Sequence, residues 1–377
     1  MIVEAVRAPV GKRNGALSGV HPTDLSAHVL GALAERSGID PAVIDDVVWG
    51  CVSQAGEQTF DIARNAVLAA GWPESVTGVT VDRQCGSSQQ SVHFVAAGLI
   101  AGQYEVAVAG GVESMSRVPM GIAVGTADPF GERFMARYGV RPNQGIGAEM
   151  VAQRWGLSRT QLDEFSVGSH DKAAAAQDEG RFDAQIAPVP LPDGTVVSKD
   201  EGIRRGGSVE TLAKLKTVFK PEGGVITAGN SSQISDGSAA LLMTTSAKAA
   251  ELGLTPIARV HTAVLAGADP VIMLTAPIPA TQKALARSGL SIDEIGAFEV
   301  NEAFAPVPLA WLAELGADPK ALNPNGGAIA LGHPLGGSGA RLMTTLVHHM
   351  RDNGIRYGLQ VMCEGGGQAN ATILELL

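Results

Sequence analysis

The chain has 377 residues, of which 45% are hydrophobic and 18% are charged, so it is long enough to bury a large core and to form two or three domains. Its net charge of −10 and its lack of a long basic block argue against nucleic-acid binding, although a local basic patch could still serve an anionic ligand. Without a run of about 18 apolar residues it has no predicted membrane span, and the charged residues within the opening MIVEAVRAP are unlike a secretion signal. We therefore expect a cytoplasmic protein.

The three cysteines, Cys51, Cys85 and Cys363, are an odd number and lie far apart in the sequence. No C-x-x-C pair occurs, so structural zinc has almost no support and no metal site is expected. The simplest interpretation is three buried, reduced thiols in a cytosolic protein. The local setting of each thiol must then decide whether it has a chemical role.

Short apolar runs that indicate buried strands alternate with helical patterns along the chain. This alternation predicts a mixed α/β protein whose helices cover its sheets. The first helical pattern covers residues 23–38, with Thr23 or Asp24 as the expected cap and Gly38 at the exit.

Three stretches near the start of the chain return in a similar rhythm about 250 residues later, which indicates a duplication of one α/β unit. The repeated features are an acidic turn before a strand, a glycine-bearing turn before a helix, and a strand that ends in glycines. The matching pairs are 39–52 with 292–304, 85–102 with 333–350, and 103–114 with 358–369.

The rhythm breaks between residue 119 and about residue 223, where proline-, glycine- and charge-rich connections surround two helical patterns, 145–156 and 160–180. A strand at 238–246 and a helix at 247–254 would then return to the first half. We expect an N-terminal half at 1–118 with 224–255, an inserted loop domain at 119–223, and a C-terminal half at 256–377.

In 80-TVDRQCGSSQQSVHF-94, Cys85 follows a predicted strand and opens a predicted helix. Unpaired amides at a helix start carry partial positive charge, which lowers the pKa of a thiol and favours the nucleophilic thiolate. The small residues Gly86, Ser87 and Ser88 would let a substrate approach closely. A buried cysteine at a turn is an equally good interpretation of this stretch alone.

In 326-GGAIALGHPLGGSGAR-341, His333 stands among glycines at a turn that leads into a helix. Histidine can accept a thiol proton near neutral pH, whereas His348 and His349 on the following helix are expected to be structural or surface residues. The glycines could instead suggest a nucleotide-phosphate loop, but the lysine of such loops is missing.

In 361-VMCEGGGQANATI-373, Cys363 again ends a strand and meets three glycines. A second thiol there could move a proton to and from a carbon centre, and the amide at Gly365 could bind an oxyanion. Glu364 is either a salt-bridged surface residue or part of the site. In 299-EVNEAFAP-306, Asn301 could position a catalytic water, or the segment could be a surface turn. Cys51 is expected to fill the core.

Together these stretches resemble the thiolase family. The resemblance covers essentially the whole chain, in order and at fitting spacing, and implies a thiolase fold: two duplicated five-stranded αβαβα halves with an inserted loop domain. The blocks that carry it are 83-RQCGSSQQ-90, 110-GGVESMSRVP-119, 227-TAGNSSQISDGSAA-240, 301-NEAF-304, 326-GGAIALGHPLGGSGAR-341 and 363-CEGGG-367.

The resemblance implies Claisen condensation, or its reverse, on coenzyme A thioesters in a homodimer or homotetramer. It assigns the nucleophile to Cys85, its base to His333 and the second acid and base to Cys363. One oxyanion site would use His333 with a water held by Asn301, and the other would use the amides of Cys85 and Gly365. Coenzyme A is implied as a co-substrate, with no permanently bound cofactor.

Residues that contact coenzyme A are expected beside the loop domain, where 202-GIRRGGSVETLAKLKTVFK-220 is the most basic stretch. A solvated helix face is an equally good interpretation of any single basic residue there. Ser232 matches the family serine near the pantetheine arm, and Phe304 is a further candidate for substrate contact. The candidates for phosphate contact are Arg204, Arg205, Lys214 and Lys216.

Some positions depart from the commoner family pattern. The nucleophile block reads CGSSQQ where many members read CSSGLQ, the last block reads CEGGG rather than CIGGG, and no M-H dipeptide precedes 147-GAEMVAQ-153. This pattern favours a degradative 3-ketoacyl-CoA thiolase of lipid or steroid breakdown. The alternatives are a short-chain biosynthetic acetoacetyl-CoA thiolase, a decarboxylating or hydroxymethylglutaryl-type synthase, and a non-catalytic acyl-CoA or lipid carrier.

Overall fold

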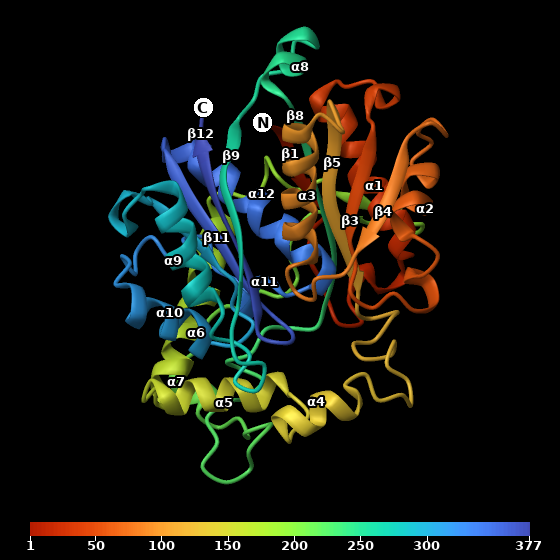
Figure 1. Cartoon of the computed structure of the whole chain (residues 1–377). Helices are drawn as coiled ribbons and strands as arrows, with labels where there is room; N and C mark the ends of the chain where they lie inside the picture. The colour runs from red at the N-terminus through yellow and green to blue at the C-terminus, as the bar shows by residue number, and fades with distance from the viewer.

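A computed structural model describes all residues from 1 to 377 (Figure 1). Ten strands are hydrogen-bonded in the order β10-β11-β12-β9-β1-β8-β5-β3-β4, with β2 paired to β8, and β6 pairs separately with β7. The strands are β1 (Ile2–Arg7), β2 (Gly11–Lys12), β3 (Asp46–Gly50), β4 (Thr77–Val81), β5 (Val106–Ser114), β6 (Val189–Pro190), β7 (Val196–Val197), β8 (Ser235–Thr244), β9 (Ala258–Gly267), β10 (Ala297–Val300), β11 (Tyr357–Glu364) and β12 (Gln368–Leu376).

Twelve α-helices cover or connect these strands. They are α1 (Pro22–Ser37), α2 (Ile62–Ala69), α3 (Ser87–Ala101), α4 (Gly131–Tyr138), α5 (Gln144–Arg154), α6 (Arg159–Asp178), α7 (Val209–Leu212), α8 (Ser246–Glu251), α9 (Pro277–Ser288), α10 (Pro306–Leu315), α11 (Ala328–Leu331) and α12 (Leu335–Asn353).

The strands fall into two groups with the same internal order. In the first group β4, β3 and β5 run parallel to one another, β8 pairs antiparallel with β5, and β1 pairs antiparallel with β8. In the second group β10 and β11 run parallel to each other, β12 pairs antiparallel with β11, and β9 pairs antiparallel with β12. A single parallel bridge between Phe298 and Leu322 stands where a fifth strand would pair with β10. The topology therefore contains the predicted repeat, with four strands and this bridge in the second half.

Helices α3 and α12 lie side by side in the middle of the molecule (Figure 1). Helix α12 packs against β5 and β8 of the first group and against β10 and β11 of the second. On the outer faces, α1 and α2 cover the first group and α9 covers the second, with α10 against α9. The layers thus run helix, sheet, helix, sheet, helix.

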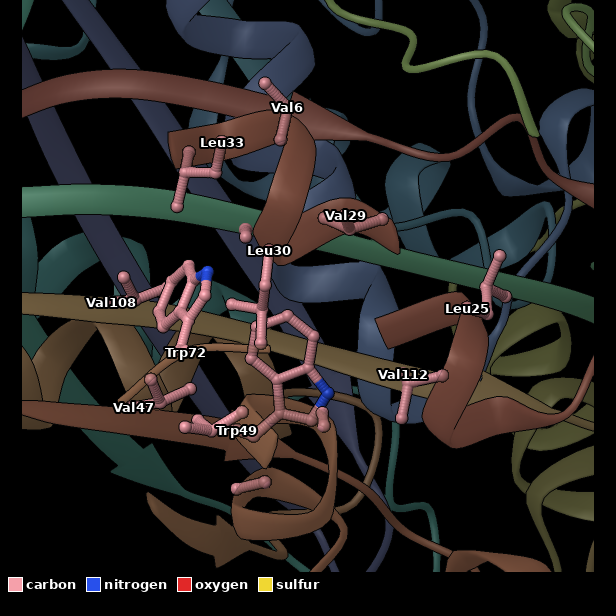
Figure 2. Packing of buried hydrophobic residues seen from close by; sticks show 14 of the residues in the cluster. Val6, Leu25, Val29, Leu30, Leu33, Val47, Trp49, Trp72, Val108 and Val112 are labelled. Atoms are coloured by element: carbon pink, nitrogen blue, oxygen red, sulfur yellow. The ribbon is translucent and has the colours of Figure 1, made fainter. Parts of the chain in front are cut away.

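The period of two along β5 separates two cores. Val106 and Val108 point into the outer core beneath α1 and α2, which also holds Trp49 and Trp72 (Figure 2). The intervening Ala107 belongs to the central core around α3 and α12. Small side chains on the central face let the two middle helices approach the sheet closely.

Helix α1 begins earlier than the sequence suggested. Its N-cap is His21, whose side chain accepts a hydrogen bond from the amide of Thr23, and Pro22 occupies the first helical position. Proline fits there because the first amides of a helix have no internal partner. The expectation of Thr23 or Asp24 as the cap is therefore wrong, whereas Gly38 ends the helix in the left-handed region as predicted.

Helices α4 to α7 lie together at one end of the molecule, at the bottom of Figure 1. Helices α5 and α6 agree with the predicted helices at 145–156 and 160–180 to within about two residues, whereas α4 was not predicted. The β6–β7 hairpin returns to the first group, where Val189 and Val197 join the outer core. The division into two halves and a loop domain stays a prediction.

A buried ion pair joins β1 to the end of this returning segment. The Arg7 guanidinium donates to both oxygens of Asp200, at 2.7 and 2.9 Å, and both side chains are fully buried. Asp200 also accepts from the amide of Val10 at 2.8 Å, and Arg7 donates to Gln185 at 2.8 Å. Such a bidentate pair holds firmly but leaves a costly buried charge if one partner is removed.

We expect Asp200→Ala to lower the free energy of unfolding by about 3–5 kcal/mol, because the guanidinium of Arg7 would be left buried without its carboxylate. Urea denaturation at fixed protein concentration measures this loss. Asp178→Ala removes the exposed partner of Arg205 and should leave the midpoint nearly unchanged. An equal loss of unfolding free energy in the two variants would show that the buried pair stabilises the fold no more than the exposed pair.

Candidate active site

The site forms where the first turns of α3 and α12 meet the ends of β3 and β5. A Cβ added to Gly50 would lie 2.4 Å from the amide nitrogen of Ser88, and one added to Gly111 would lie 2.3 Å from the carbonyl of Gly336. A Cβ on Gly336 would in turn lie 2.6 Å from Cα of Cys51. Because only glycine fits at these contacts, the two helix starts are brought together by backbone packing.

Cys85 sits in a strained turn immediately before α3. Gln84 has a φ of 49°, in the left-handed region that non-glycine residues seldom adopt. The turn is held by Ser87, whose hydroxyl accepts from the amide of Arg83 at 2.9 Å and donates to the carbonyl of Gln84 at 2.6 Å. Strain that the surroundings enforce in this way is typical of functional sites.

The Cys85 thiol is buried beside Met115, Leu335 and Met362. Burial first, and then the nearby Glu364, raise its pKa to about 12, although the amides of Cys85 and Gly365 act in the opposite direction. The expectation of a lowered thiol pKa at this helix start is therefore wrong, because desolvation outweighs the amide dipoles. The resting thiol is protonated and needs a base.

Cys363, at the end of β11, lies close to Cys85. Burial raises the pKa of Cys363 well above its ordinary value, and charge on Cys85 is the next largest cause. The Cys363 side chain packs in a buried cluster with Phe304 and Ala303. Two thiols contributed by the two repeated units thus share one small region.

His333 is buried just before α12 and is oriented on both sides of its ring. Nδ1 lies 2.6 Å from the Ser338 hydroxyl, which donates its own proton to the carbonyl of Pro334 at 2.9 Å. The hydroxyl oxygen is then left to accept, which places the ring proton on Nδ1 and leaves Nε2 as a base. Sequence reasoning missed Ser338, although a hydroxyl in the glycine-rich first turn was the available signal.

Burial first, and then Arg341, lower the pKa of His333 to about 3. The imidazole is therefore neutral at physiological pH and able to receive a proton. Its Nε2 lies 3.4 Å from Nδ2 of Asn301, and the Oδ1 atom of Asn301 has no hydrogen-bond partner. An amide placed in this way can also hold a water molecule.

The N-E-A-F segment is buried, so its interpretation as a surface turn is wrong. Glu302 accepts from Ser169 at 2.6 Å, from Asn323 at 2.8 Å and from the amide of Ile329 at 3.2 Å. These bonds tie α6 and α11 to the strand end that carries Asn301. Glu302 therefore supports the site structurally.

Gly365 opens the tight turn between β11 and β12, in which Gly366 and Gly367 have φ values of 82° and 76°. Its amide is one of the two that act on the Cys85 sulfur. Glu364 is also buried here, so the interpretation as a surface salt bridge is wrong.

Ser232 and Phe304 lie on neighbouring backbone segments. The amide of Ser232 donates to the carbonyl of Ala303 at 2.9 Å, and Ser231 bridges to Phe304. Phe304 belongs to the same buried cluster as Cys363. The structure therefore brings these two candidates together, and Phe304 packs in the same cluster as the second thiol.

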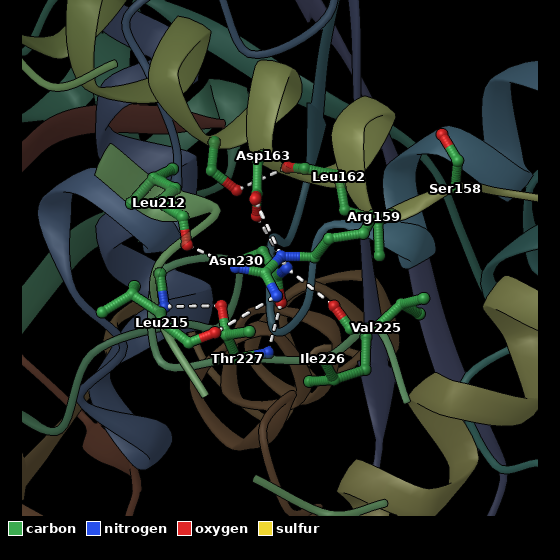
Figure 3. Close-up of polar contacts among 12 residues, drawn as sticks. Ser158, Arg159, Leu162, Asp163, Leu212, Leu215, Val225, Ile226, Thr227 and Asn230 are labelled. Carbon is green, nitrogen blue, oxygen red and sulfur yellow. Dashed lines mark hydrogen bonds and ion pairs between the residues drawn. The ribbon is translucent and has the colours of Figure 1, made fainter. Parts of the chain in front are cut away.

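A polar network holds the loop that leads to Ser232 (Figure 3). Asp163 accepts from Arg159 at 2.7 Å and from Asn230 at 3.0 Å. Asn230 also accepts from the amide of Thr227 at 2.8 Å, while Arg159 donates to the carbonyl of Leu212. Helix α6 thereby positions the loop against the basic stretch.

Arg204 lines two cavities, one of about 310 Å³ and one of about 600 Å³. Arg205 lines the smaller cavity and pairs with Asp178 at 2.7 Å. The larger cavity is lined by Ser232 and by two basic residues that sequence reasoning missed, Lys12 and Arg13. Proximity to Ser232 in space, which the sequence does not show, is what identifies them.

Lys214 and Lys216 are exposed and line neither of these cavities. The structure does not bring them together with Arg204 and Arg205. Nowhere do three or more His, Cys, Asp or Glu side chains gather in a way that could hold a metal ion. None of the helices combines the length and apolar character needed to cross a membrane.

Comparisons with known proteins find similarity along the whole chain. The family model described as the thiolase N-terminal domain matches residues 1–247, and the thiolase C-terminal domain matches residues 254–376. A protein named steroid 3-ketoacyl-CoA thiolase FadA6 from Mycobacterium tuberculosis is 49% identical, over 100% of this chain and 94% of its own length. A 3-ketoacyl-CoA thiolase from Pseudoalteromonas translucida is 45% identical, over 100% and 98%.

Among solved structures, the acetyl-CoA acetyltransferase of Bacillus anthracis is similar with a TM-score of 0.92 at 38% identity. The match covers 100% of this chain and 98% of that one. The layered architecture thus belongs to a known fold.

We expect Ser338→Ala to weaken the preference of His333 for the Nδ1–H tautomer, because the only hydroxyl acceptor at Nδ1 is removed. Nitrogen NMR of histidine-labelled protein should show a new population protonated at Nε2. The Ser338→Thr variant keeps a hydroxyl and should retain the original pattern. An unchanged tautomer in the alanine variant would contradict this orienting role.

Proposed function

The chain belongs to the thiolase family, and we propose that it is a degradative thiolase that cleaves a 3-ketoacyl-CoA with coenzyme A into acetyl-CoA and a shortened acyl-CoA. As a thiolase it is an acyltransferase. The observation that carries the proposal is the pairing of two buried thiols, one from each repeated unit, whose pKa values are electrostatically linked. The full-length relatives named 3-ketoacyl-CoA thiolase support this substrate class.

In the first half of the reaction, the neutral His333 takes the proton of Cys85, and the thiolate attacks the keto carbon. The bond between the α and β carbons breaks, and Cys363 gives its proton to the acetyl-CoA carbanion. An acyl group remains on Cys85. Forming a covalent thioester divides one difficult step into two easier ones.

In the second half, the Cys363 thiolate takes the proton of an incoming coenzyme A. The coenzyme A thiolate attacks the acyl carbonyl, the shortened acyl-CoA leaves, and Cys85 regains its proton from His333. The amides of Cys85 and Gly365 would bind the oxyanion of this step, which fits their action on the Cys85 sulfur. His333 with a water held by Asn301 would serve the other oxyanion.

The second cysteine favours this reaction over the alternatives. A decarboxylating synthase uses histidine or asparagine partners for its cysteine, and a non-catalytic carrier needs no reactive thiol. Here Cys363 is buried where the charge of Cys85 acts on it, and a second thiol there can serve as a proton donor to carbon. A short-chain biosynthetic enzyme would use the same residues, and only the relatives' names favour the degradative role.

Coenzyme A would lie over the two cavities that share Arg204. The guanidiniums of Arg204 and Arg205 are the proposed phosphate contacts, and Ser232 the pantetheine contact. Lys214 and Lys216 stay candidates for long-range attraction of the phosphates, since both are exposed near this end. The acyl chain would reach Cys85 past Phe304.

We propose that the chain works as a homo-oligomer. Strand β4 is the outer edge of its sheet, and exposed apolar side chains gather there and on the neighbouring α3. A second copy is the natural cover for an apolar edge of this kind. These side chains are Val79, Phe94 and Ile100.

The three free cysteines fit a reducing compartment such as the cytoplasm.

We expect Cys85→Ala to abolish acyl-enzyme formation while the fold survives, because the nucleophilic sulfur is removed and only a small side chain is truncated. The measurement is the intact mass after mixing with acetoacetyl-CoA. The unmodified protein should gain one acetyl group and the variant none. Normal turnover by the variant would refute the assignment of the nucleophile.

We expect Cys363→Ser to permit slow acylation of Cys85 from acetyl-CoA but to lower carbon–carbon bond cleavage by at least about 100-fold, because a serine hydroxyl is a far weaker acid than a thiol. Stopped-flow thiolysis of 3-ketoacyl-CoAs of different length and branching tests this. Near-normal thiolysis would count against the second acid and base. The same substrate series, applied to the unmodified protein, identifies the preferred acyl chain.

A further inference from the structure

We propose that Glu364 controls thiolate formation at the two catalytic cysteines, permitting it while the carboxyl group is protonated and opposing it once the group is ionised. This inference rests on the proposed function, because it concerns the same two thiols. It assigns a role to Glu364, which the sequence alone left as either a surface residue or part of the site.

Glu364 is placed against the nucleophile turn. It follows Cys363 on β11, so the two side chains point to opposite faces of the strand. Its Oε1 atom would lie 2.1 Å from a Cβ built on Gly86, the residue directly after Cys85. Asn370 of β12 donates to the carbonyl of Gly86 at 3.0 Å and closes the other side. The carboxyl group is therefore held against the turn that carries Cys85, one residue along β11 from Cys363.

The carboxyl group is buried without an ion-pair partner. Neither of its oxygens makes a hydrogen bond of normal geometry, and the neighbouring Nε of Arg83 and Oδ1 of Asn370 are also unpaired. The backbone amide of Asn370 and the charge of Arg83 offset only part of the cost of burial. Arg83 instead donates to Gln368 at 2.9 Å. A carboxylate in such surroundings is costly, so the neutral form is favoured. Consistent with this, burial raises the pKa of Glu364 to about 8, against a smaller opposing effect of Arg83.

The charges around Glu364 come from few elements. The turn before α3 supplies Arg83 and Cys85, and β11 supplies Cys363. Strand β12 offers only the amide side chains of Gln368 and Asn370. Farther away on β5, Glu113 raises the pKa of Cys85 less than Glu364 does. Glu364 is thus the carboxyl group with the strongest influence on both thiols.

The consequence is a coupled titration. For a simple thiol, the rate of alkylation rises about tenfold per pH unit, because the thiolate is the reactive form. Ionisation of Glu364 near its pKa of about 8 adds a nearby negative charge and raises the pKa of both cysteines. The alkylation rate of Cys85 should therefore flatten and stay nearly constant around that pH. At higher pH it should rise again, but remain below the rate expected for a thiol without this neighbour.

The test is alkylation of Cys85 by iodoacetamide between about pH 6 and about pH 10, with the labelled Cys85 peptide quantified by mass spectrometry. The unmodified protein should show the flattened region. Glu364→Gln should show an uninterrupted rise, equal to the unmodified protein near pH 6 and about 10- to 100-fold faster near pH 10. Superimposable profiles of the two proteins would overturn the proposal.

Glu299→Gln is the matched control. Glu299 on β10 is another buried carboxyl group without hydrogen-bond partners, and burial likewise raises its pKa to about 8. It is not among the groups that shift the pKa of either catalytic cysteine, so this variant should keep the flattened region. Loss of that region in the control as well would show a general loosening of the site and would also overturn the proposal.

The alkylation profile of the unmodified protein and a parallel acetylation assay separate failure of this proposal from failure of the proposed function. If Glu364→Gln does not fold, the unmodified protein alone decides, since a uniform rise without flattening would contradict the coupling. Acetylation of Cys85 by acetoacetyl-CoA is measured in parallel. If Cys85 is not acetylated, the proposed function fails, whereas acetylation with a uniform alkylation profile removes only the role of Glu364.

Discussion

The site depends on close backbone packing between the starts of α3 and α12 and the ends of β3 and β5. Gly50, Gly111 and Gly336 leave no room for a side chain at these contacts. Glu113 adds to them by accepting from the amide of Gly336 at 2.9 Å, a favourable place for a carboxylate at a helix start. This packing brings Cys85 and His333, which are 248 positions apart by their numbers, into one site.

The same packing removes water and thereby sets the charge state of the resting site. Burial raises the pKa of both cysteines and lowers that of His333 to about 3, so all three groups are neutral before substrate arrives. In the proposed mechanism, charge then appears only when His333 takes the thiol proton. In the same mechanism, preorganised amides at Cys85 and Gly365 stabilise that charge without rearrangement, and Glu364 opposes it only once its carboxyl group is ionised.

The sequence predicts the layers and the repeat, because strand endings and glycine turns are local patterns. It also singles out Cys85, His333 and Cys363, all of which the structure buries, and their catalytic roles stay predictions. It does not predict the pKa of Cys85, because the residues that bury this thiol include Met362, which lies far along the chain. Lys12 and Arg13 were missed for the same reason, since only folding brings them beside Ser232. The N-cap of α1 is His21 and not Thr23 or Asp24, because Pro22 occupies the first helical position.

Cross-linking with 1,3-dibromoacetone, which joins two thiols only when they lie within a few ångströms of one another, tests the convergence of the two cysteines most directly. Mass spectrometry of the digested protein should find the Cys85 peptide joined to the Cys363 peptide, and prior acylation of Cys85 should prevent the link. Recovery of the two peptides only as separately alkylated species, with no link between them, would contradict a shared reaction centre.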